Sequence, residues 1–380
     1  MKKRIAVLGC GRIGAAIARD LAGDNDLEVC VFDASEKNLA SVRASATVRT
    51  EIADLADIPA LSAKLTPFDA VAGALPSRLG FDALKAIAGL GKPCADISFM
   101  IEDPRQLDDL ARASGATIVY DCGVAPGLAN ICIGRSHAEL DALDDVVYYV
   151  GGLPWRRQWP FDYKAPFAPS DVIEEYTRPA RMIENGATVV KPALTEPELL
   201  DFPQVGTLEG FNTDGLRSLL DTIPARNMRE KTLRYPGHCA LMRAFRETGL
   251  FDTSPMRVGD ADIRPIDMTS KILADMWLLE ADEPEFTVLR VIVEGTREGR
   301  RERHTYDLFD ERDAATGMSS MARTTAFPCT IVARMLAQGQ LRAPGVHPPE
   351  WIGGQSQAYE TLIEGLRRRN VHVARTQTEL

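Results

Sequence analysis

The feature that most constrains this chain is a glycine-rich turn after its first apolar run. Residues 5–8 are uniformly apolar, which is typical of a strand buried on both faces of a parallel sheet. Gly9, Gly11 and Gly14 follow at the G-x-G-x-x-G spacing, and an amphipathic helical pattern occupies 12–21. In a dinucleotide-binding turn the first glycine permits the tight bend, the second admits a pyrophosphate, and the third lets the helix pack on the strand.

The start of this helix and the end of the second strand are the expected contacts of a dinucleotide. Arg12 and Ile13 open the helix, whose amides and dipole would face the phosphates. The second strand, 27–32, ends at Asp33, 22 positions past Gly11, where an acidic residue binds the ribose hydroxyls. No arginine follows Asp33 directly, so we expect NAD rather than NADP. The alternative is a purely structural turn, with Asp33 capping the next helix.

Strands and helices alternate regularly up to about residue 120. This alternation predicts an α/β fold, namely a Rossmann-type doubly wound parallel sheet with helices on both faces. The expected strands are 5–8, 27–32, 47–50, 68–75, 93–98 and 116–120, and the expected helices are 12–21, 36–44, 55–65, 81–89 and 105–114.

Polar residues and loops at the carboxyl ends of these strands are candidate site positions. Asp54 follows the third strand and either contacts adenine or caps the next helix. Leu75 and Pro76 end the fourth strand beside the topological switch point, near the expected path of the nicotinamide. Asp96 and Asp121 end the fifth and sixth strands; each is a candidate general base or, alternatively, a helix cap or loop brace.

The pattern changes beyond this point. Cys122 and Gly123 lie in a turn at 121–127, where we expect Cys122 to pack beside the nicotinamide rather than act as a nucleophile. A helix over 128–138 precedes scattered strands at 146–151 and 188–190 and a predicted hairpin of 286–295 with 301–309. Loops rich in proline and aromatic residues occupy 153–155 and 159–167. These patterns predict an inserted α+β domain.

The predicted organisation is a Rossmann domain over 1–122, a second domain over 123–317, to which the family resemblance described below gives the catalytic and dimerisation roles, and a segment over 318–380 that we expect to return to the first domain. A helix over 318–336 is expected to kink or restart at Pro328. A loop at 345–349 and a helix over 359–369 complete the segment.

Composition excludes several function classes. The net charge of −10 disfavours nucleic-acid binding, and no stretch approaches the 18 apolar residues of a membrane span. The seven cysteines are scattered without a C-x-x-C pair, and the five histidines lack metal-ligand spacing, so we expect no metal and reduced thiols of a cytoplasmic protein. The absence of an apolar signal segment at the N-terminus agrees with a cytoplasmic location.

Several motifs together resemble those of the saccharopine dehydrogenase family. They are the glycine turn, 121–130, 150–154, 231–238 and 345–350, so the resemblance covers nearly the whole chain. It is strongest to the lysine 6-dehydrogenase branch. The resemblance implies NAD-dependent oxidation of the ε-amine of L-lysine, or a close diamino acid, to the semialdehyde with release of ammonia. It also implies a homodimer or a higher homo-oligomer.

Two departures separate the branches of the family. The saccharopine-forming branch usually has aspartate where this chain has Ala125, and Asn-Arg-Asp where it has 212–214. Fewer charges in the pocket disfavour saccharopine as the substrate. Two alternatives remain open: a saccharopine- or carboxynorspermidine-type reductase that condenses an amine with an aldehyde, and an NAD-binding regulatory protein.

A lysine substrate needs a cation for its carboxylate and a way to lose an amine proton. Arg234 is the candidate cation, through a bidentate fork; alternatively it pairs with Glu230 or Glu209. Lys164 is a second candidate cation or a solvated lysine. His238 is a candidate base because an unperturbed imidazole titrates near neutrality, or it is a capping or core residue. The further candidates Glu174 and Glu175 form a solvated acidic pair or bind the substrate's α-amine.

Overall fold

The computed structural model describes residues 2–165, 169–280 and 282–380, which form two compact units. Unit 1 comprises the chain up to residue 138 together with 322–371, and unit 2 comprises 139–321 together with 372–380. Three segments lie in another unit than the expected division gives them: residues 123–138 lie in the first unit, and residues 318–321 and the last nine residues lie in the second.

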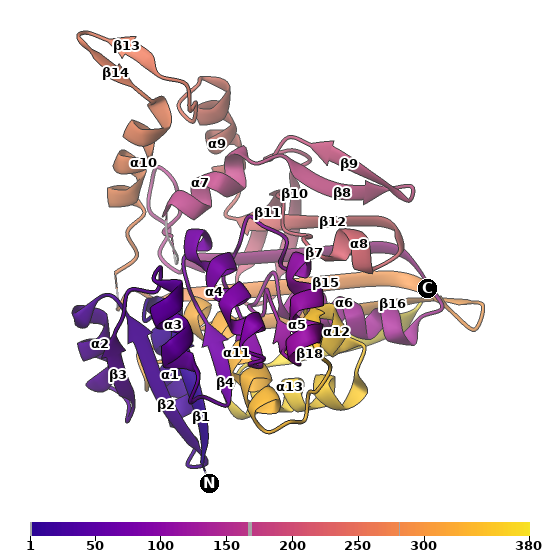
Figure 1. Ribbon diagram of the computed structural model, residues 1–380. Helices are drawn as coiled ribbons and strands as arrows, with labels where there is room; N and C mark the ends of the chain where they lie inside the picture. Colours follow the sequence, from indigo (N-terminus) through magenta and orange to yellow (C-terminus); the bar gives the residue numbers. More distant parts are fainter. Residues whose placement is uncertain (1, 166–168, 281) are drawn as a thin grey trace. The chain divides into compact units, whose positions relative to one another are not determined.

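Unit 1 is built on a parallel sheet in the order β17-β6-β5-β4-β1-β2-β3 (Figure 1). From β3 to β6 this is the Rossmann order, with the switch point between β1 and β4. The fold predicted from the alternation is therefore confirmed. The strands are β1 (Lys3–Leu8), β2 (Leu27–Asp33), β3 (Arg49–Ile52), β4 (Ala70–Gly73), β5 (Cys94–Asp96), β6 (Thr117–Val119) and β17 (Gly345–His347).

Strand β17 corrects the loop expected at 345–349. Gly345 pairs in parallel with Thr117, and His347 with Val119, so the returning segment extends the sheet beyond β6. A strand of three residues shows no measurable alternation of polar and apolar side chains, which is why its sequence read as a loop.

The helices of unit 1 follow the predicted pattern closely. Ser35 caps α2, since its hydroxyl accepts a hydrogen bond from the Asn38 amide at 3.3 Å. Asp57, not Asp54, caps α3 by accepting from the Ala60 amide at 3.1 Å. The elements are α1 (Arg12–Ala22), α2 (Glu36–Arg43), α3 (Ile58–Leu65), α4 (Ser77–Gly89), η1 (Pro104–Leu107), α5 (Asp108–Ser114), α6 (Leu128–Glu139), α11 (Ser320–Ala337), which contains Pro328, α12 (Glu350–Gly353) and α13 (Ser356–Arg368).

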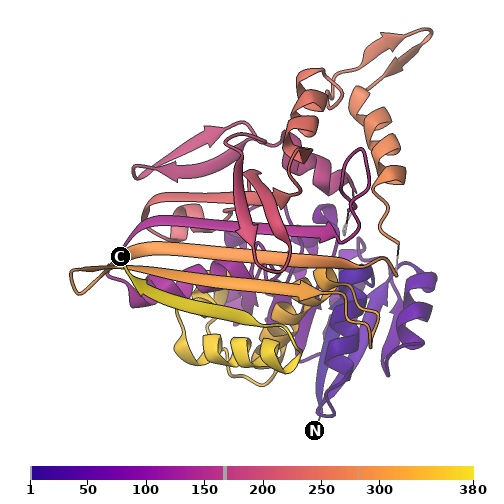
Figure 2. The same cartoon turned by 180° about the vertical axis from the view of Figure 1, so that it is seen from behind.

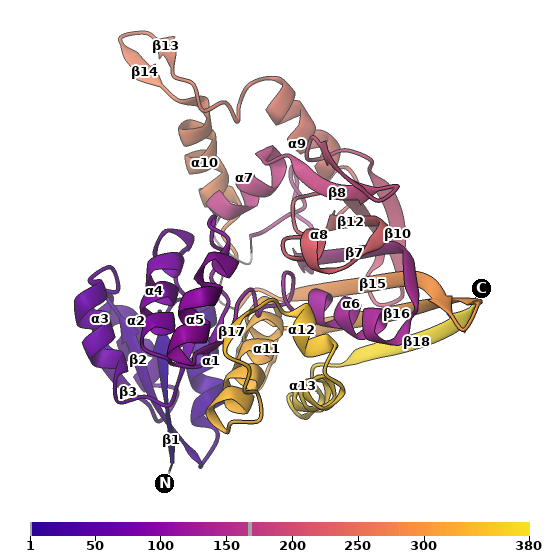
Figure 3. The ribbon, with the colours of Figure 1, turned by 45° about the vertical axis from the view of Figure 1, so that its right-hand side comes forward.

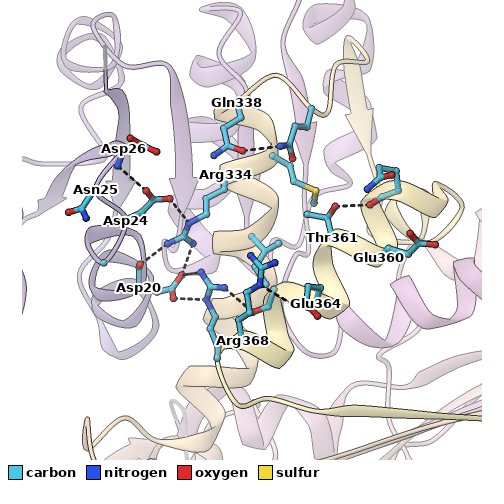
Figure 4. Close-up of a pocket in the computed structure, with 17 residues that line it drawn as sticks. Asp20, Asp24, Asn25, Asp26, Arg334, Gln338, Glu360, Thr361, Glu364 and Arg368 are labelled. Atoms are coloured by element: carbon cyan, nitrogen blue, oxygen red, sulfur yellow. Dashed lines mark hydrogen bonds and ion pairs between the residues drawn. The ribbon is translucent and has the colours of Figure 1, made fainter.

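An ion-pair network joins the returning helices to α1. Asp20 at the end of α1 bonds Arg334 of α11 at 2.6 Å and Arg369, just after α13, at 2.6 Å (Figure 4). These groups line an open groove of about 1000 Å³. These ion pairs hold residues of the returning segment against α1. The arginines of the groove therefore already have carboxylate partners.

Unit 2 is built on a mixed sheet in the order β10-β11-β12-β7-β15-β16-β18 (Figure 2). The predicted hairpin is present: β15 pairs antiparallel with β16 from Phe286↔Glu311 to Arg297↔Arg300. The strands are β7 (Ala142–Pro154), β8 (Ala180–Glu184), β9 (Ala187–Lys191), β10 (Glu198–Phe202), β11 (Gly206–Asn212), β12 (Ala225–Arg234), β15 (Glu285–Arg297), β16 (Arg300–Glu311) and β18 (Val373–Glu379).

Three helices lie at one end of this sheet (Figure 3). Side chains from these helices and the neighbouring loops bury a group of aromatic rings that we call the aromatic cluster: Phe161, Tyr163, Tyr176, Phe211, Phe251 and Trp277. The helices are α7 (Pro169–Thr177), α9 (His238–Glu247) and α10 (Pro265–Met276), while the short α8 (Leu219–Thr222) lies elsewhere; a small hairpin of β13 (Met256–Val258) and β14 (Ala261–Ile263) precedes α10. Of the predicted aromatic and proline-rich loop, residues 166 and 167 lie outside the described residues. Within the described part of the chain, no helix is both long and apolar enough to cross a membrane.

Candidate active site

The glycine turn of unit 1 has the geometry that a dinucleotide requires. Gly9 has a φ of 89°, and a Cβ there would lie 2.5 Å from the Ala74 carbonyl oxygen. A Cβ on Gly14 would overlap the Gly9 carbonyl oxygen. A Cβ on Gly11, in contrast, would meet no atom within 4 Å. The first and third glycines are therefore needed by the fold, whereas the second leaves the backbone open to a ligand.

Asp33 lies beside this turn. Its carboxylate accepts hydrogen bonds from the Cys10 amide at 2.6 Å and from the Ser35 amide at 2.7 Å. Helix α1 starts at the turn with Gly11 as its N-cap and no acidic side chain in its first turn, which includes Arg12 and Ile13. An open glycine, an uncapped helix start and an adjacent carboxylate fit the pyrophosphate and ribose of a dinucleotide.

The loop after β4 borders the same turn. The Leu75 amide donates a hydrogen bond to the Ser98 hydroxyl at 3.1 Å, and Pro76 is the N-cap of α4. Leu75 Cδ2 lies 3.5 Å from the position of a Cβ on Gly9, so the β1–α1 and β4–α4 loops are neighbours at the switch point. Asp54 is exposed after β3, and its carboxylate accepts from the Ala56 amide at 3.0 Å.

Asp96 is a buried carboxyl group at this edge of the sheet. It packs against bare Gly73 of β4 and accepts from the Ser98 amide at 2.7 Å. Burial, with a smaller contribution from the Asp121 carboxylate, raises the pKa of Asp96 to about 6. A carboxyl group with this pKa can accept a proton near neutral pH.

The turn after β6 is equally buried. Asp121 has a φ of 49°, and the Cys122 amide donates to the Asp96 carbonyl oxygen at 2.8 Å. Burial raises the pKa of the Cys122 thiol far above its usual range, so the thiol stays protonated and packs. The Gly123 amide donates to the Pro126 carbonyl oxygen at 3.2 Å, which closes the turn.

The centre of unit 2's aromatic cluster is Arg234, at the end of β12. Its Nη2 donates to Glu175 of α7 at 2.8 Å, Nε to the Tyr176 hydroxyl at 3.1 Å, and Nη1 to the Leu233 carbonyl oxygen at 2.9 Å. The ring of Tyr163 lies 4.4 Å from the guanidinium carbon. Arg234 thus pairs with Glu175 and not with Glu230 or Glu209. Glu209 instead accepts from the Gly237 amide at the start of α9.

His238 continues the hydrogen-bond chain from Arg234. Its Nδ1 lies 2.9 Å from the Phe161 carbonyl oxygen and must carry the proton, so Nε2 accepts from the Tyr176 hydroxyl at 2.9 Å. Burial and the positive charge of Arg234 lower the pKa of His238 to about 3. The imidazole therefore stays neutral and orients Tyr176, which argues against the base expected from its residue type.

Two buried donors of the same cluster have no acceptor among the described residues. They are the Tyr163 hydroxyl and Nε1 of Trp277, whose rings lie 5.4 Å apart. A buried donor left unpaired costs about 1–3 kcal/mol. Arg234 lies over the ring of one of them, Tyr163. An arginine beside a buried unpaired donor suits a ligand rich in acceptors, and a carboxylate is the simplest one.

Lys164 lies outside this hydrogen-bond chain. Its Nζ donates to the Leu278 carbonyl oxygen at 2.9 Å and lies 4.0 Å from the Glu283 carboxylate, so its charge braces a loop. Glu174, for its part, pairs with Arg178 at 2.6 Å as a partly exposed acid. Arg234, in contrast, lies over the ring of Tyr163, whose hydroxyl is one of the two unpaired donors.

Sequence reasoning missed Glu230, which lies on β12 with Thr232 and Arg234 at alternate positions. The Thr213 hydroxyl donates to its carboxyl group at 2.6 Å. Burial, with the neighbouring Glu175 and Asp214 carboxylates, raises the pKa of Glu230 to about 8. Glu230, Thr232 and Arg234 stand at every second position, which on a strand places their side chains on one face. This spacing could have revealed Glu230, but no strand was predicted here.

Glu230 makes the stability of the protein depend on pH. Between its ordinary pKa of about 4.3 and its native value of about 8, the unfolded chain ionises this group while the native chain keeps it protonated. Its contribution to the free energy of unfolding is therefore complete below that window and is lost as the pH rises through it. At about 1.36 kcal/mol per pKa unit, wild type should lose a few kcal/mol of unfolding free energy as the pH rises through this window. Glu230→Gln cannot ionise at this position, so the variant should not show that loss.

Urea unfolding at about pH 5 and about pH 9 measures this effect. Glu364→Gln is the matched control, because Arg367 and Arg368 lower the pKa of Glu364 to about 2 and it stays ionised throughout. An equal pH dependence in wild type and Glu230→Gln would contradict the assignment.

No group of histidine, cysteine, aspartate or glutamate residues in the described ranges could hold a metal ion. The cysteines in those ranges are buried, and none of them forms a disulfide bond.

Comparisons with known proteins identify one family over most of the chain. The family model for the saccharopine dehydrogenase C-terminal domain matches residues 123–371, and the model for the saccharopine dehydrogenase NADP binding domain matches residues 5–119. The solved apo saccharopine dehydrogenase (L-Glu forming) of Saccharomyces cerevisiae superposes with a TM-score of 0.83 at 18% identity, covering 99% of this chain and all of that one.

Relatives in sequence are distant. The alpha-aminoadipic semialdehyde synthase of Mus musculus is 22% identical over all of this chain, and that of Bos taurus is 23% identical over 97% of it. The chain spans about half the length of these two proteins, 48% and 47%. The saccharopine dehydrogenase [NADP(+), L-glutamate-forming] of S. cerevisiae is 21% identical over 92% of this chain and 94% of its own.

Proposed function

Because the chain belongs to the saccharopine dehydrogenase family, we propose that it is an NAD-dependent dehydrogenase that oxidises the ε-amine of L-lysine or a close diamino acid. Loss of the hydride to NAD and of a proton converts the amine into an imine, which water hydrolyses, so the products are the semialdehyde, ammonia and NADH. The observation that carries the substrate class is the cluster around Arg234, where a buried guanidinium lies over the ring of Tyr163, whose buried hydroxyl has no acceptor among the described residues. This donor set suits the carboxylate of an amino acid.

In this proposal Glu175 gives way to the substrate. Arg234 is 2% exposed, whereas the side chain of Glu175 is 31% exposed and forms the outer half of the pair. A substrate carboxylate that displaces Glu175 leaves the charge balance of the site unchanged and reaches the Tyr163 and Trp277 donors as well. The chain from Arg234 through Tyr176 to His238 keeps the guanidinium in place meanwhile.

The cofactor, when bound, supplies the hydride acceptor, so the side chains have to orient the amine and receive its proton. A free lysine ε-amine has a pKa of about 10.4, and only its neutral form can lose a hydride from the adjacent carbon. Of the expected bases, His238 is held neutral with its ring nitrogens bonded, while Asp96 has a pKa of about 6. We assign the proton acceptor to Asp96, with Asp121 as its neighbour.

A screen for reduced cofactor tests the function. Lysine, ornithine, saccharopine and polyamines are each offered with NAD, and lysine is expected to give NADH at a rate that rises toward alkaline pH, because the neutral fraction of the amine rises. Release of NADH from saccharopine alone would redirect the assignment to that substrate. A rate that stays flat down to about pH 6 would contradict the need for a neutral amine.

Cofactor choice is tested at Asp33. The family model is described as NADP binding, and a relative is named for NADP(+), yet the Asp33 carboxylate sits beside the turn, where it would repel a ribose phosphate. Asp33→Asn is expected to lower kcat/KM for NAD and to shift the NAD:NADP ratio of kcat/KM toward NADP by roughly tenfold, which corresponds to about 1.4 kcal/mol. Glu36→Gln, three residues further on, is the control. An unchanged NAD:NADP ratio of kcat/KM would refute the ribose assignment.

A second candidate is a reductase that condenses an amine with an aldehyde. The names of the relatives favour it, since several are saccharopine dehydrogenases. Its mark is oxidation of the reduced cofactor only when an amino acid and an aldehyde are both present.

A further inference from the structure

Three carboxyl groups of unit 2 lie close enough to act on one another, and two of them have an arginine partner. Asp214, which follows β11, pairs with Arg181 of β8 at 2.9 Å. Glu175 of α7 pairs with Arg234 at 2.8 Å. Glu230 on β12 is 3% exposed and forms no ion pair within the described part of the chain. Because an unpaired carboxylate is costly to bury, we expect this third group to hold a proton.

The surroundings of Glu230 consist of hydroxyl groups and bare backbone. The Thr213 hydroxyl lies 2.6 Å from a carboxyl oxygen of Glu230 and 2.8 Å from the Thr232 hydroxyl. A Cβ on Gly215 would lie 2.7 Å from the carboxyl carbon, so the glycine leaves the space that the carboxyl group occupies. Tyr148, the register neighbour of Glu230 on β7, donates to the Gly215 carbonyl oxygen at 2.6 Å. The carboxyl group is therefore held by neutral partners.

Glu230 is also coupled to the charges at Arg234. The two residues lie on the same face of β12, because they are separated by an even number of positions along the strand. Burial, together with the Glu175 and Asp214 carboxylates, raises the pKa of Glu230 to about 8. A negative charge beside Arg234 therefore opposes the ionisation of Glu230.

A carboxylate ligand at Arg234 would strengthen this opposition. At the guanidinium one carboxylate replaces another, but Glu175 stays tethered to α7 close by. The ligand's charge would lie at a guanidinium that is 2% exposed, whereas the Glu175 side chain that it displaces is already 31% exposed. The cluster then contains one more negative charge, and in buried surroundings this charge acts on Glu230 with little screening by water.

We propose that Glu230 is a proton-holding residue of the substrate site: a carboxylate binds at Arg234 best while Glu230 is protonated, and its binding drives a proton onto Glu230 where that group has ionised. This coupling rests on the proposed function, because that function places a carboxylate at Arg234. Alkaline conditions, which free the ε-amine of lysine, would at the same time weaken the hold on its carboxylate.

Binding of hexanoate to the native full-length protein tests the coupling. Hexanoate has a carboxylate that stays ionised between about pH 6 and about pH 10 and no other group that titrates there. If its binding raises the pKa of Glu230 by about one unit, calorimetric titration should give a dissociation constant roughly tenfold higher at about pH 10 than at about pH 6. Between about pH 8 and 9 the heat should depend on the buffer, because a proton is taken up. Hexanamide, the uncharged counterpart, should show neither effect.

Two variants and a control assign the effect to this residue. Glu230→Gln cannot ionise, so its affinity for hexanoate should not change with pH. Thr213→Val removes a hydrogen bond that lowers the pKa of Glu230, so the fall in affinity should move to higher pH. Glu198→Gln is the matched control and should behave as wild type, because the carboxylate that it removes already pairs with Lys231 at 2.7 Å. Urea unfolding reports whether each variant is folded.

A pH dependence of hexanoate affinity that persists in folded Glu230→Gln and does not move in Thr213→Val would overturn the coupling, as would a wild type that does not bind hexanoate at about pH 6. A wild type that shows the expected dependence but does not oxidise lysine would refute the proposed function and leave the coupling standing. Oxidation of lysine by a wild type whose hexanoate affinity is the same at every pH would do the reverse.

Discussion

Arg234→Ala is expected to lower kcat/KM for lysine by roughly 10- to 150-fold, the equivalent of about 1.5–3 kcal/mol for a charged hydrogen bond. Arg234→Lys should lose much of the same activity, because an ammonium keeps the charge but cannot form the planar fork with a carboxylate. Steady-state kinetics with lysine measures both effects.

A second substrate separates recognition from damage to the fold. 1,5-Diaminopentane is lysine without its carboxylate, so its turnover by wild type should be poor and should change little in the Arg234 variants. Arg229→Ala is the matched control, since Arg229 lies on the same strand but pairs with Asp145 at 2.8 Å. An equal loss on both substrates would mean that Arg234 only supports packing.

Gly11→Ala is expected to leave the fold intact while lowering kcat/KM for NAD by on the order of 100-fold, because displacing a bound group by about 1 Å can cost that much. Its Cβ meets no protein atom within 4 Å but stands where a pyrophosphate would approach the backbone. Gly14→Ala should instead lose stability, by about 1–3 kcal/mol for overpacking, because its Cβ overlaps the Gly9 carbonyl oxygen.

Thermal unfolding and NAD titration together distinguish the two glycines. Gly89→Ala in α4 is the control, since it lies in a helix with no atom within 4 Å of the added carbon; it should leave NAD binding unchanged and should not lower the unfolding temperature, because alanine favours a helix over glycine. Normal NAD binding by a folded Gly11→Ala protein would remove the turn from the cofactor site.

The nucleotide-binding half of the fold could be predicted because its signals are local. The Ser35 cap, the bond from the Ser35 amide to Asp33 and the contact of Gly14 with Gly9 all join residues close in the sequence, and the alternation of strands and helices specifies the parallel sheet. Strand β17 was missed because three residues show no periodicity. The compact units divide the chain after residue 138, beyond the change of pattern near residue 123, because such a change does not reveal which core a helix joins.

The substrate cluster could be predicted only in part because its members come from distant elements. Arg234 and His238 stood out by residue type, but Tyr163, Tyr176 and Trp277 carried no local signal that they surround Arg234. Residue type also gave no sign that the pKa of His238 is lowered, since its burial and the charge beside it follow from tertiary packing.

The path of the chain through the two units has a consequence for biosynthesis. The polypeptide crosses from one unit to the other after residues 138, 321 and 371, and β18, which follows the last crossing, pairs along β16. Neither unit is encoded by one uninterrupted stretch of the gene. A nascent chain on the ribosome can therefore complete the first unit only after residues 322–371 have emerged and the second only after residues 372–380, and dividing the gene at residue 138 or 321 would separate strands of one sheet.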